Sequence, residues 1–370
     1  MRAPIASALA AALLLWAAGC PEPLDGADGG PATAGPAGRP PMVDSHVHLL
    51  PSPRALARAL ALFDQVGVTR FCAKSAGVPG SGRYRATLAV QRRLGERFAF
   101  FVNPDWDGFG QPGWLEREVG RLEVAARDGA RGVKIFKALG LSVRDPEGRL
   151  VPVDDPRLDP WFEAAGRLGL IVAIHTADPL TFFDPPGPRN ERHLELLFAP
   201  NWSFAGEGLP SKAELLAQRD RRLARHPGTT FLGIHLANSP EDLGYVDRLL
   251  DARPNLLVDT SARVPEFGRH PPAEVRAFFL EHQARILFGT DIVIDEDSYQ
   301  LGSLSIWPDE DQDAVRFFQA HRDFFETERR GLRHPTPIQG AWTVDGIGLP
   351  REALDRIYRQ NAERLIWKVR

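Results

Sequence analysis

The amino-acid sequence predicts a (β/α)8 TIM barrel that spans residues 42–370. Strand and helix signals alternate through this region and form eight units, as such a barrel requires. The strand signals are short, near-continuous runs of Ile, Leu, Val and Phe, which are typical of strands buried on both faces. Four runs stop at a His or Asp, and in a barrel of parallel strands the catalytic groups gather at that end.

The expected elements follow one another in a regular order along the chain. We expect strands at residues 42–46, 69–73, 98–102, 132–136, 170–175, 230–235, 255–259 and 285–291. Helical segments lie between them, at residues 54–66, 84–94, 114–127, 156–168, 212–225, 241–252 and 272–281. Because a helix joins each strand to the next, the strands are expected to run parallel around the barrel.

The first strand carries the most informative motif, Asp44-Ser45-His46-Val47-His48. Side chains at alternate positions of a strand point to the same side. The two imidazoles, with Asp44 in register, are therefore expected to project together from the strand end. Two histidines at this spacing reach one metal ion without strain, so the motif predicts metal binding.

Three later strands repeat this design, because they end at His175, His235 and Asp291. A single histidine at a strand end is more often a hydrogen-bonded or surface residue than a metal ligand. Four such ends at one face of a barrel together predict a metal site. The other histidines lie in helical or loop contexts and are interpreted as structural: His193, His226, His270, His282, His321 and His334.

These motifs resemble those of a known family. Asp-x-His-x-His on the first strand, a His closing each of two middle strands, and Gly289-Thr290-Asp291 closing the last resemble the signature of the amidohydrolase superfamily. Residues 361–365 (Asn-Ala-Glu-Arg-Leu) look like the C-terminal helix of its amidohydrolase 2 branch. The resemblance covers roughly residues 42–367 and implies a metal-dependent enzyme. It implies no single reaction, because this branch mixes hydrolases, lactonases, decarboxylases and hydratases on one scaffold.

The resemblance and the ligand chemistry together imply roles for the site residues. With one metal, His46, His48, His175 and Asp291 hold a divalent ion, Zn²⁺ or another such as Mn²⁺. Such an ion activates water near neutral pH. Asp291 is expected to take the water proton and pass it to the leaving group. His235 is expected to stabilise the developing oxyanion.

Lys134 leaves the number of metal ions open. In binuclear members of the superfamily a lysine on the fourth strand is carboxylated and bridges two metals, and Lys134 matches that position better than Lys137. His175 and His235 would then hold the second ion. The alternative is a lysine that pairs with a carboxylate or holds a substrate anion. One metal per chain is the preferred interpretation.

Two segments are expected near a small-molecule substrate. The connection at residues 176–228 is unusually long, which is typical of an active-site lid, although a packed surface excursion is the alternative. Arg263 follows the seventh strand and is placed to clamp a substrate carboxylate, or else to pair with a loop carboxylate. Aromatic residues recur among the prolines and glycines of the long connection: Phe182, Phe183, Trp202 and Phe204.

The N-terminal region predicts where the protein works. Arg2 precedes an Ala/Leu-rich run at residues 5–18, as in a secretory signal peptide, and the run is short for a membrane span. Residues 17–20 (Ala-Ala-Gly-Cys) resemble a bacterial lipobox, in which Cys20 is lipidated; an ordinary signal peptide is the alternative. Residues 21–41 are rich in Pro, Gly and Ala and predict a flexible tether. We therefore expect a periplasmic domain that is lipid-anchored to the outer membrane.

Composition narrows the function classes. The formal net charge is −3 and no large basic block occurs, which argues against nucleic acid as a partner. The leading hypothesis is a metal-dependent hydrolase of an ester, lactone or amide bond in a small molecule. A metal-dependent decarboxylase or other lyase is the alternative, and a non-catalytic binding lipoprotein is the third. The sequence makes no prediction of oligomeric state.

Overall fold

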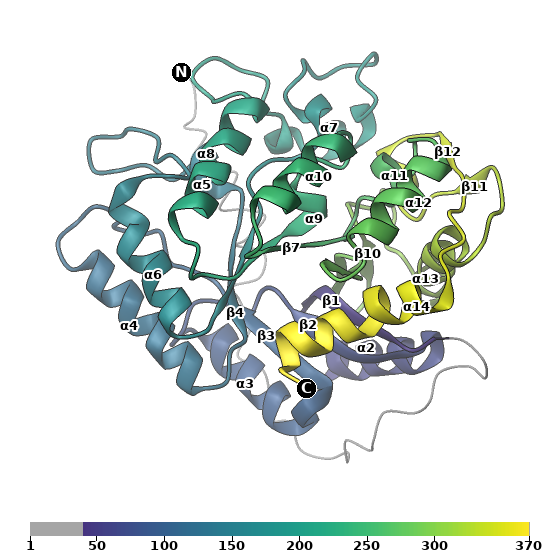
Figure 1. The fold of residues 1–370 in the computed structure, drawn as a ribbon. Coiled ribbons are helices and arrows are strands. Elements are labelled where there is room, and N and C mark those ends of the chain that lie inside the picture. Colours follow the sequence, from purple (N-terminus) through teal and green to yellow (C-terminus); the bar gives the residue numbers. More distant parts are fainter. Residues whose placement is uncertain (1–39, 370) are drawn as a thin grey trace.

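Eight short parallel strands follow one another in chain order around a barrel, which confirms the predicted TIM-barrel fold (Figure 1). The computed structural model describes residues 40–369. The strands are β1 (Met42–Leu49), β2 (Val68–Ala73), β3 (Phe98–Val102), β4 (Gly132–Ile135), β5 (Ile171–Ile174), β6 (Phe231–Gly233), β7 (Leu256–Asp259) and β8 (Ile286–Leu287).

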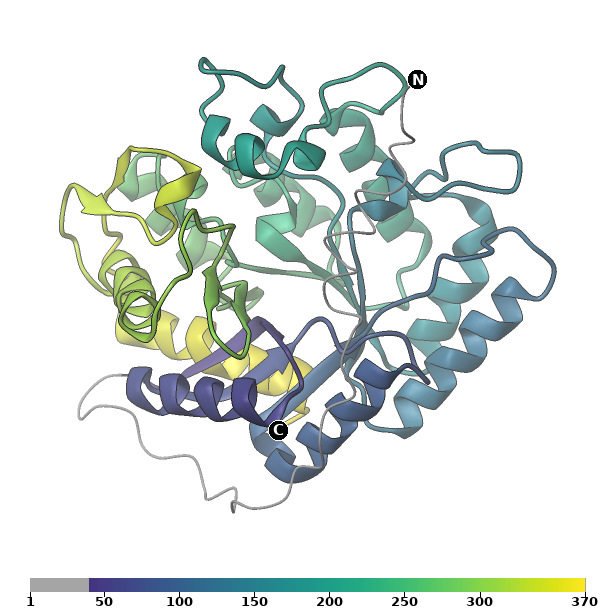
Figure 2. The ribbon, with the colours of Figure 1, turned by 180° about the vertical axis from the view of Figure 1, so that it is seen from behind.

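Helices cover the outside of the strands in both views (Figures 1 and 2). Local sequence signals set their ends. The side chain of Ser52 accepts a hydrogen bond from the N–H of Ala55 at the start of the first helix, and Gly67 ends that helix with φ of 82°. The helices are α2 (Pro53–Val66), α3 (Gly82–Leu94), α4 (Trp114–Arg127), α6 (Asp159–Arg167), α8 (Lys212–Arg225), α10 (Leu243–Ala252) and α12 (Pro272–Glu281).

The barrel closes between its first and last strands in a way that differs from the expectation. The eighth strand does not run to Asp291: β8 ends at Leu287 and a second strand, β9 (Ile292–Ile294), pairs in parallel with β1. Between them, the Ser45 N–H donates to the Phe288 carbonyl (3.0 Å) and the Asp291 N–H donates to the His46 carbonyl (2.9 Å). Asp291 itself has φ of 63°, so the chain turns there instead of continuing as a strand.

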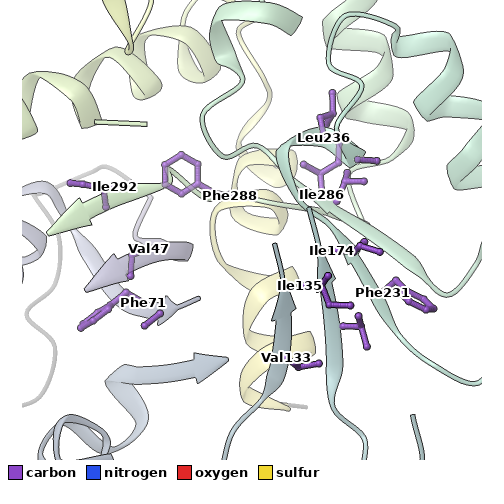
Figure 3. Close-up of a cluster of buried hydrophobic side chains, with 14 of the residues drawn as sticks. Val47, Phe71, Val133, Ile135, Ile174, Phe231, Leu236, Ile286, Phe288 and Ile292 are labelled. Atoms are coloured by element: carbon purple, nitrogen blue, oxygen red, sulfur yellow. The ribbon is translucent and has the colours of Figure 1, made fainter. Parts of the chain in front are cut away.

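Two apolar clusters hold the fold together. The larger lies between the strands and the helices, and Figure 3 shows part of it, including Val47, Phe71 and Ile174. The smaller fills the barrel with residues such as Val43 and Phe101, and Ile366 and Trp367 from the C-terminal helix join it. The Trp367 indole donates to the Glu96 carbonyl, just before β3, so this helix closes the barrel at the strands' N-terminal end. The opposite end is left for the functional residues.

The chain after β9 adds elements that the sequence did not predict. The strand β10 (Tyr299–Leu301) pairs antiparallel with β9, and α13 (Asp311–Glu326) packs on α2. The segment expected to be a C-terminal helix is helical, as part of a run that begins with α14 (Arg351–Asp355). Short elements complete the fold: α5 (Ala138–Leu141), α7 (His193–Phe198), α9 (Ile234–Ala237), α11 (Val264–Phe267), β11 (Leu332–Arg333) and β12 (Thr343–Val344).

The predicted signal peptide, the lipobox with Cys20 and nearly all of the tether lie outside the described residues. Within the part of the chain that the structure describes, no helix combines the length and apolar character that crossing a membrane requires. Cys72 on β2 is buried and free.

Candidate metal centre

The two histidines of β1 meet Asp291 at the C-terminal end of the barrel. Asp291 Oδ1 lies 3.2 Å from His46 Nε2 and 3.1 Å from His48 Nε2. Within residues 40–369, these three side chains form the group whose possible ligand atoms all lie within 4.8 Å of one another. The turn after β8 and the strand β1 therefore place three of the predicted ligands around one point.

His46 is held by a buried carboxylate on its far side. Its Nδ1 lies 2.9 Å from Asp259 Oδ2, at the end of β7, and 2.9 Å from Ser261 Oγ. Because a carboxylate accepts hydrogen bonds, Nδ1 carries the proton and Nε2 presents its lone pair to Asp291. Burial lowers the pKa of His46 to about 4, so the imidazole is neutral at physiological pH. The sequence placed Asp259 at a strand end but gave it no role.

Asp44 has a different role from the expected one, since it turns away from the metal-competent group. Its carboxylate accepts hydrogen bonds from the Thr290 hydroxyl (2.6 Å), the Thr290 N–H (3.2 Å) and the His46 N–H (3.1 Å). The pairing of β1 with β2 shifts register between Asp44 and Val47, which breaks the simple alternation of side chains. Asp44 thus ties β1 to the turn that carries Asp291. Burial raises its pKa to about 7.

His235 sits in a left-handed turn and not at the end of a straight strand. The strand β6 ends at Gly233, and residues 235–238 have φ of 57°, 52°, 52° and 56°. Four consecutive residues in this region, none of them glycine, are costly for L-amino acids, and such strain is concentrated at functional sites. The Asp259 carboxylate accepts the His235 N–H (2.8 Å) and helps to hold the turn.

The ring of His235 is oriented toward Asp291. Its Nδ1 lies 2.9 Å from the Ser261 carbonyl oxygen, which only accepts, so this nitrogen carries the proton. Its Nε2 lies 4.0 Å from Asp291 Oδ2. Burial holds the pKa of His235 well below its usual range, so the ring is neutral with a lone pair on Nε2.

His175, the fourth predicted ligand, lies beside this group but is turned to another partner. Its ring centre is 4.6 Å from that of His235, and its Nε2 lies 3.1 Å from Asp178 Oδ1. The other oxygen of Asp178 is ion-paired with Lys137. The loop that follows β5 therefore supplies His175 with a carboxylate partner that the sequence analysis did not identify.

Lys134 projects into the centre of the site from β4. Its Nζ lies 3.2 Å from His46 Nε2 and 5.0 Å from the ring centre of Phe136. The side chain is buried, and this burial lowers the pKa of the amine to about 7. Lys134 contacts an imidazole nitrogen. Among the described residues, its amine forms no ion pair with a carboxylate, which the alternative of a structural lysine had expected.

Arg263 contacts the same loop carboxylate as His175. Its Nη2 is 3.6 Å from Asp178 Oδ1, and its Nη1 donates to the Ala262 carbonyl (3.0 Å). The long segment after β5 contributes aromatic side chains on this side, with Trp202 and Phe204 facing the Lys137 amine. The structure thus brings Arg263 and the long connection to the same side of the centre.

The residues of the centre fit a divalent cation. Neutral imidazoles and an ionised carboxylate are the donors that ions such as Zn²⁺ prefer. Burial keeps the imidazoles neutral, and contact with the histidines keeps the pKa of Asp291 well below its usual range despite its burial. The lone pair of His46 Nε2 faces the Asp291 carboxylate, an arrangement that a cation between them would stabilise.

Comparisons with known proteins identify the family and the fold of the chain. The family model for amidohydrolases matches residues 43–366. Among curated proteins, no sequence matches the chain. The structure of 2,6-dihydroxybenzoate decarboxylase from Rhizobium has a TM-score of 0.51 at 15% identity, over 89% of this chain and 99% of its own. A complex of 2,6-dihydroxybenzoate decarboxylase with 2,6-dihydroxybenzoate has a TM-score of 0.50 at 15% identity, over 91% and 99%. These likenesses show the shared fold, and the family match over most of the chain shows that the protein belongs to the amidohydrolase family.

Proposed function

We propose that the protein is a metal-dependent hydrolase that cleaves an ester, lactone or amide bond in a small molecule with activated water. One observation carries this proposal: the possible ligand atoms of His46, His48 and Asp291 all lie within 4.8 Å of one another. We propose one ion per chain, Zn²⁺ or another divalent metal such as Mn²⁺, held by these residues and His175. His175 contributes only if its ring turns from Asp178 or if its Nδ1 is the ligand atom.

The chemistry of the reaction divides between the ion and the protein. A bound divalent ion supplies Lewis acidity, which polarises a carbonyl group and activates water near pH 7. Asp291 is the proposed proton carrier, because its side chain is 22% exposed and is the most accessible of the three. Its carboxylate accepts the proton of the attacking water and returns it to the leaving group.

His235 is proposed to stabilise the oxyanion, and the geometry adds a condition to this role. Its Nδ1 already donates to the Ser261 carbonyl, so Nε2 must gain a proton before it donates to an oxyanion. Asp291 Oδ2, 4.0 Å away, is the described group placed to pass that proton. In this proposal the proton taken from water passes from Asp291 to His235 Nε2, stays there while the oxyanion exists, and returns through Asp291 to the leaving group when the intermediate collapses.

A metal-dependent decarboxylase is the second candidate. The two solved structures compared above are decarboxylases, and the same ligands serve either reaction. At 15% identity these structures support the fold and leave the choice of reaction to experiment.

A substrate panel separates the two candidates. The metal-loaded protein is incubated with esters, lactones, amides and aromatic carboxylic acids, and both hydrolysis products and CO₂ are measured. Metal-dependent formation of an alcohol, hydroxy acid or amine supports the hydrolase. Release of CO₂ without a hydrolysis product contradicts it and supports the decarboxylase. The Asp291→Asn variant serves as the control for turnover at this site.

We also propose that the protein acts in the bacterial periplasm, with its only membrane attachment through lipid on Cys20. The support is the N-terminal sequence pattern, which lies outside the described residues. The proposed substrate is a small molecule, and nucleic acid is not a proposed partner.

A further inference from the structure

We propose that Arg263 and Lys137 form the binding subsite for a carboxylate of the substrate, and that Asp178 occupies this subsite as an internal anion when substrate is absent. The inference rests on the proposed function for the identity of the site, and it names the substrate class. It rests on the contacts of three residues on three different loops, those that follow β4, β5 and β7.

Asp178 is the carboxylate on which the surrounding donors converge. Its side chain is buried, and it contacts the Lys137 amine, His175 Nε2 (3.1 Å) and Arg263 Nη2 (3.6 Å). Two cations and one imidazole therefore share one carboxylate. This arrangement carries more positive charge and more donors than a single anion satisfies.

The Arg263 guanidinium has fewer hydrogen-bond acceptors than a buried charge requires. The residue is 6% exposed, and its Nε has no hydrogen-bond partner among the described residues. Its Nη2 is 3.6 Å from Asp178, which is beyond hydrogen-bond distance, so Nη1 makes the one short contact, to the Ala262 carbonyl. Buried donors without partners are costly, and a guanidinium offers a planar fork that matches a carboxylate. An incoming substrate carboxylate accepts the hydrogen bonds of the Arg263 guanidinium that Asp178 does not accept.

Lys137 and its aromatic neighbours indicate the kind of molecule that carries the carboxylate. The Lys137 amine lies 4.8 Å from the ring centre of Trp202 and 5.3 Å from that of Phe204, both in the segment between β5 and β6. Aromatic faces hold the ammonium by cation–π attraction and also offer apolar contact area. The subsite therefore suits an organic carboxylate with an apolar, planar body.

The subsite lies beside the proposed catalytic residues. His175, which contacts Asp178, has its ring centre 4.6 Å from that of His235. A carboxylate bound by Arg263 and Lys137 consequently places the rest of the molecule next to the centre formed by His46, His48 and Asp291. Displacement of Asp178 also frees His175 Nε2 from its carboxylate partner.

The test measures binding of benzoate to the purified metal-loaded protein by titration calorimetry, without turnover. Arg263→Met and Lys137→Met should each weaken benzoate binding by roughly 10- to 100-fold, because each variant loses a charge-assisted hydrogen bond to the carboxylate. Asp178→Asn should tighten it by at least about tenfold, because it removes a competing negative charge and keeps the side-chain shape. Arg269→Met is the matched control, because Arg269 is exposed and pairs with Glu191 (2.9 Å) away from this cluster.

The gain of affinity in Asp178→Asn distinguishes this proposal from a purely structural ion-pair cluster. Unchanged or weaker benzoate binding in Asp178→Asn overturns the proposal, and so does unchanged binding in Arg263→Met. Failure of both the wild type and Asp178→Asn to bind benzoate overturns it too. If Arg263→Met does not fold, Arg263→Lys replaces it, and its loss of the planar fork should still weaken binding. The predicted affinity pattern without hydrolysis of any panel substrate would refute the proposed reaction and leave the carboxylate subsite standing.

Discussion

His46 Nε2 and Asp291 Oδ1 lie 3.2 Å apart, although each presents a lone pair to the other. The cause is on the far side of the imidazole, where Asp259 takes the proton of Nδ1 in a hydrogen bond of 2.9 Å. Two acceptors face each other without strain only when a cation or a proton lies between them. The Lys134 amine lies 3.2 Å from His46 Nε2, and a divalent ion between His46 and Asp291 would supply the positive charge that both acceptors need.

Asp259 is expected to control metal affinity without touching the ion. Replacing Asp259 by Asn removes the charge behind His46 while keeping the side-chain shape, so the imidazole becomes less basic and less firmly oriented. We expect metal affinity to fall by about 10- to 100-fold, the usual effect of losing such a supporting carboxylate. Competition with a chelator of known affinity measures it. Wild-type affinity in Asp259→Asn would show that this contact does not tune the site.

Asp291 is expected to be needed for the rate as well as for metal binding. Asp291→Asn keeps one oxygen donor but cannot carry a proton, so turnover should fall by ~10²–10⁴-fold. The fold should persist, because Asp44 and Thr290 hold the turn independently of the Asp291 carboxylate. Steady-state kinetics at saturating metal, with circular dichroism as the check on folding, tests this. Near-normal turnover at full metal occupancy would show that another group carries the proton during the reaction.

The buried His321 on α13 leads to a prediction about how folding stability depends on pH, and this prediction does not involve the metal centre. Burial lowers its pKa to about 4, and its Nδ1 donates to the Phe317 carbonyl (2.8 Å). The unfolded chain takes up the proton near pH 6.5, whereas the folded protein resists protonation down to about pH 4. The stability contribution is therefore complete above pH 6.5 and is lost as the pH falls toward 4, by about 3 kcal/mol in all.

His321→Gln removes this titration, so the variant should lose less stability than the wild type between pH 7 and pH 4.5. Urea unfolding at a series of pH values measures the difference. His193→Gln, on the partly exposed helix α7, is the matched control for exchanging a histidine for glutamine. Parallel pH profiles for the wild type and His321→Gln would contradict the assignment of a buried neutral imidazole.

The N-terminal prediction is tested on the cell-derived protein. We expect mature protein to begin at a diacylated Cys20 and to separate with membranes, because two acyl chains anchor stably where one is marginal. Cys20→Ser should block processing or release a soluble, fully active domain. Mass spectrometry of the mature N-terminus decides the question. An unmodified N-terminus beyond Cys20 on a soluble protein would refute the lipid anchor and leave the enzyme proposal intact.

The sequence predicted the regular parts of the barrel well. The helices α4, α8 and α12 have the bounds that their sequences indicate, and β3 does so as well. Local signals determine such elements: apolar runs of strand length, and capping residues such as Ser211, which accepts the Glu214 N–H at the start of α8. The sequence also indicated His46, His48 and Asp291 from their residue types at strand ends, and the fold brings these three side chains together.

The sequence could not supply what depends on contacts between distant segments. Asp259 is a carboxylate at a strand end like several others, and its role appears only when β7 lies beside His46. The left-handed turn at residues 235–238 contains no glycine, so no local signal marks it. The pairing of His175 with Asp178 likewise depends on Lys137 and Arg263, which reach the same carboxylate from other loops.

Anomalous X-ray diffraction at a metal absorption edge, from crystals of the purified protein, tests the central claim most directly. We predict one strong peak per chain, within bonding distance of His46 Nε2, His48 Nε2 and the Asp291 carboxylate. The His48→Ala variant, crystallised under the same conditions, should lose most of that peak. No peak at this position in metal-supplemented wild-type crystals, or a peak that His48→Ala leaves unchanged, would contradict the assignment of these residues as a metal centre.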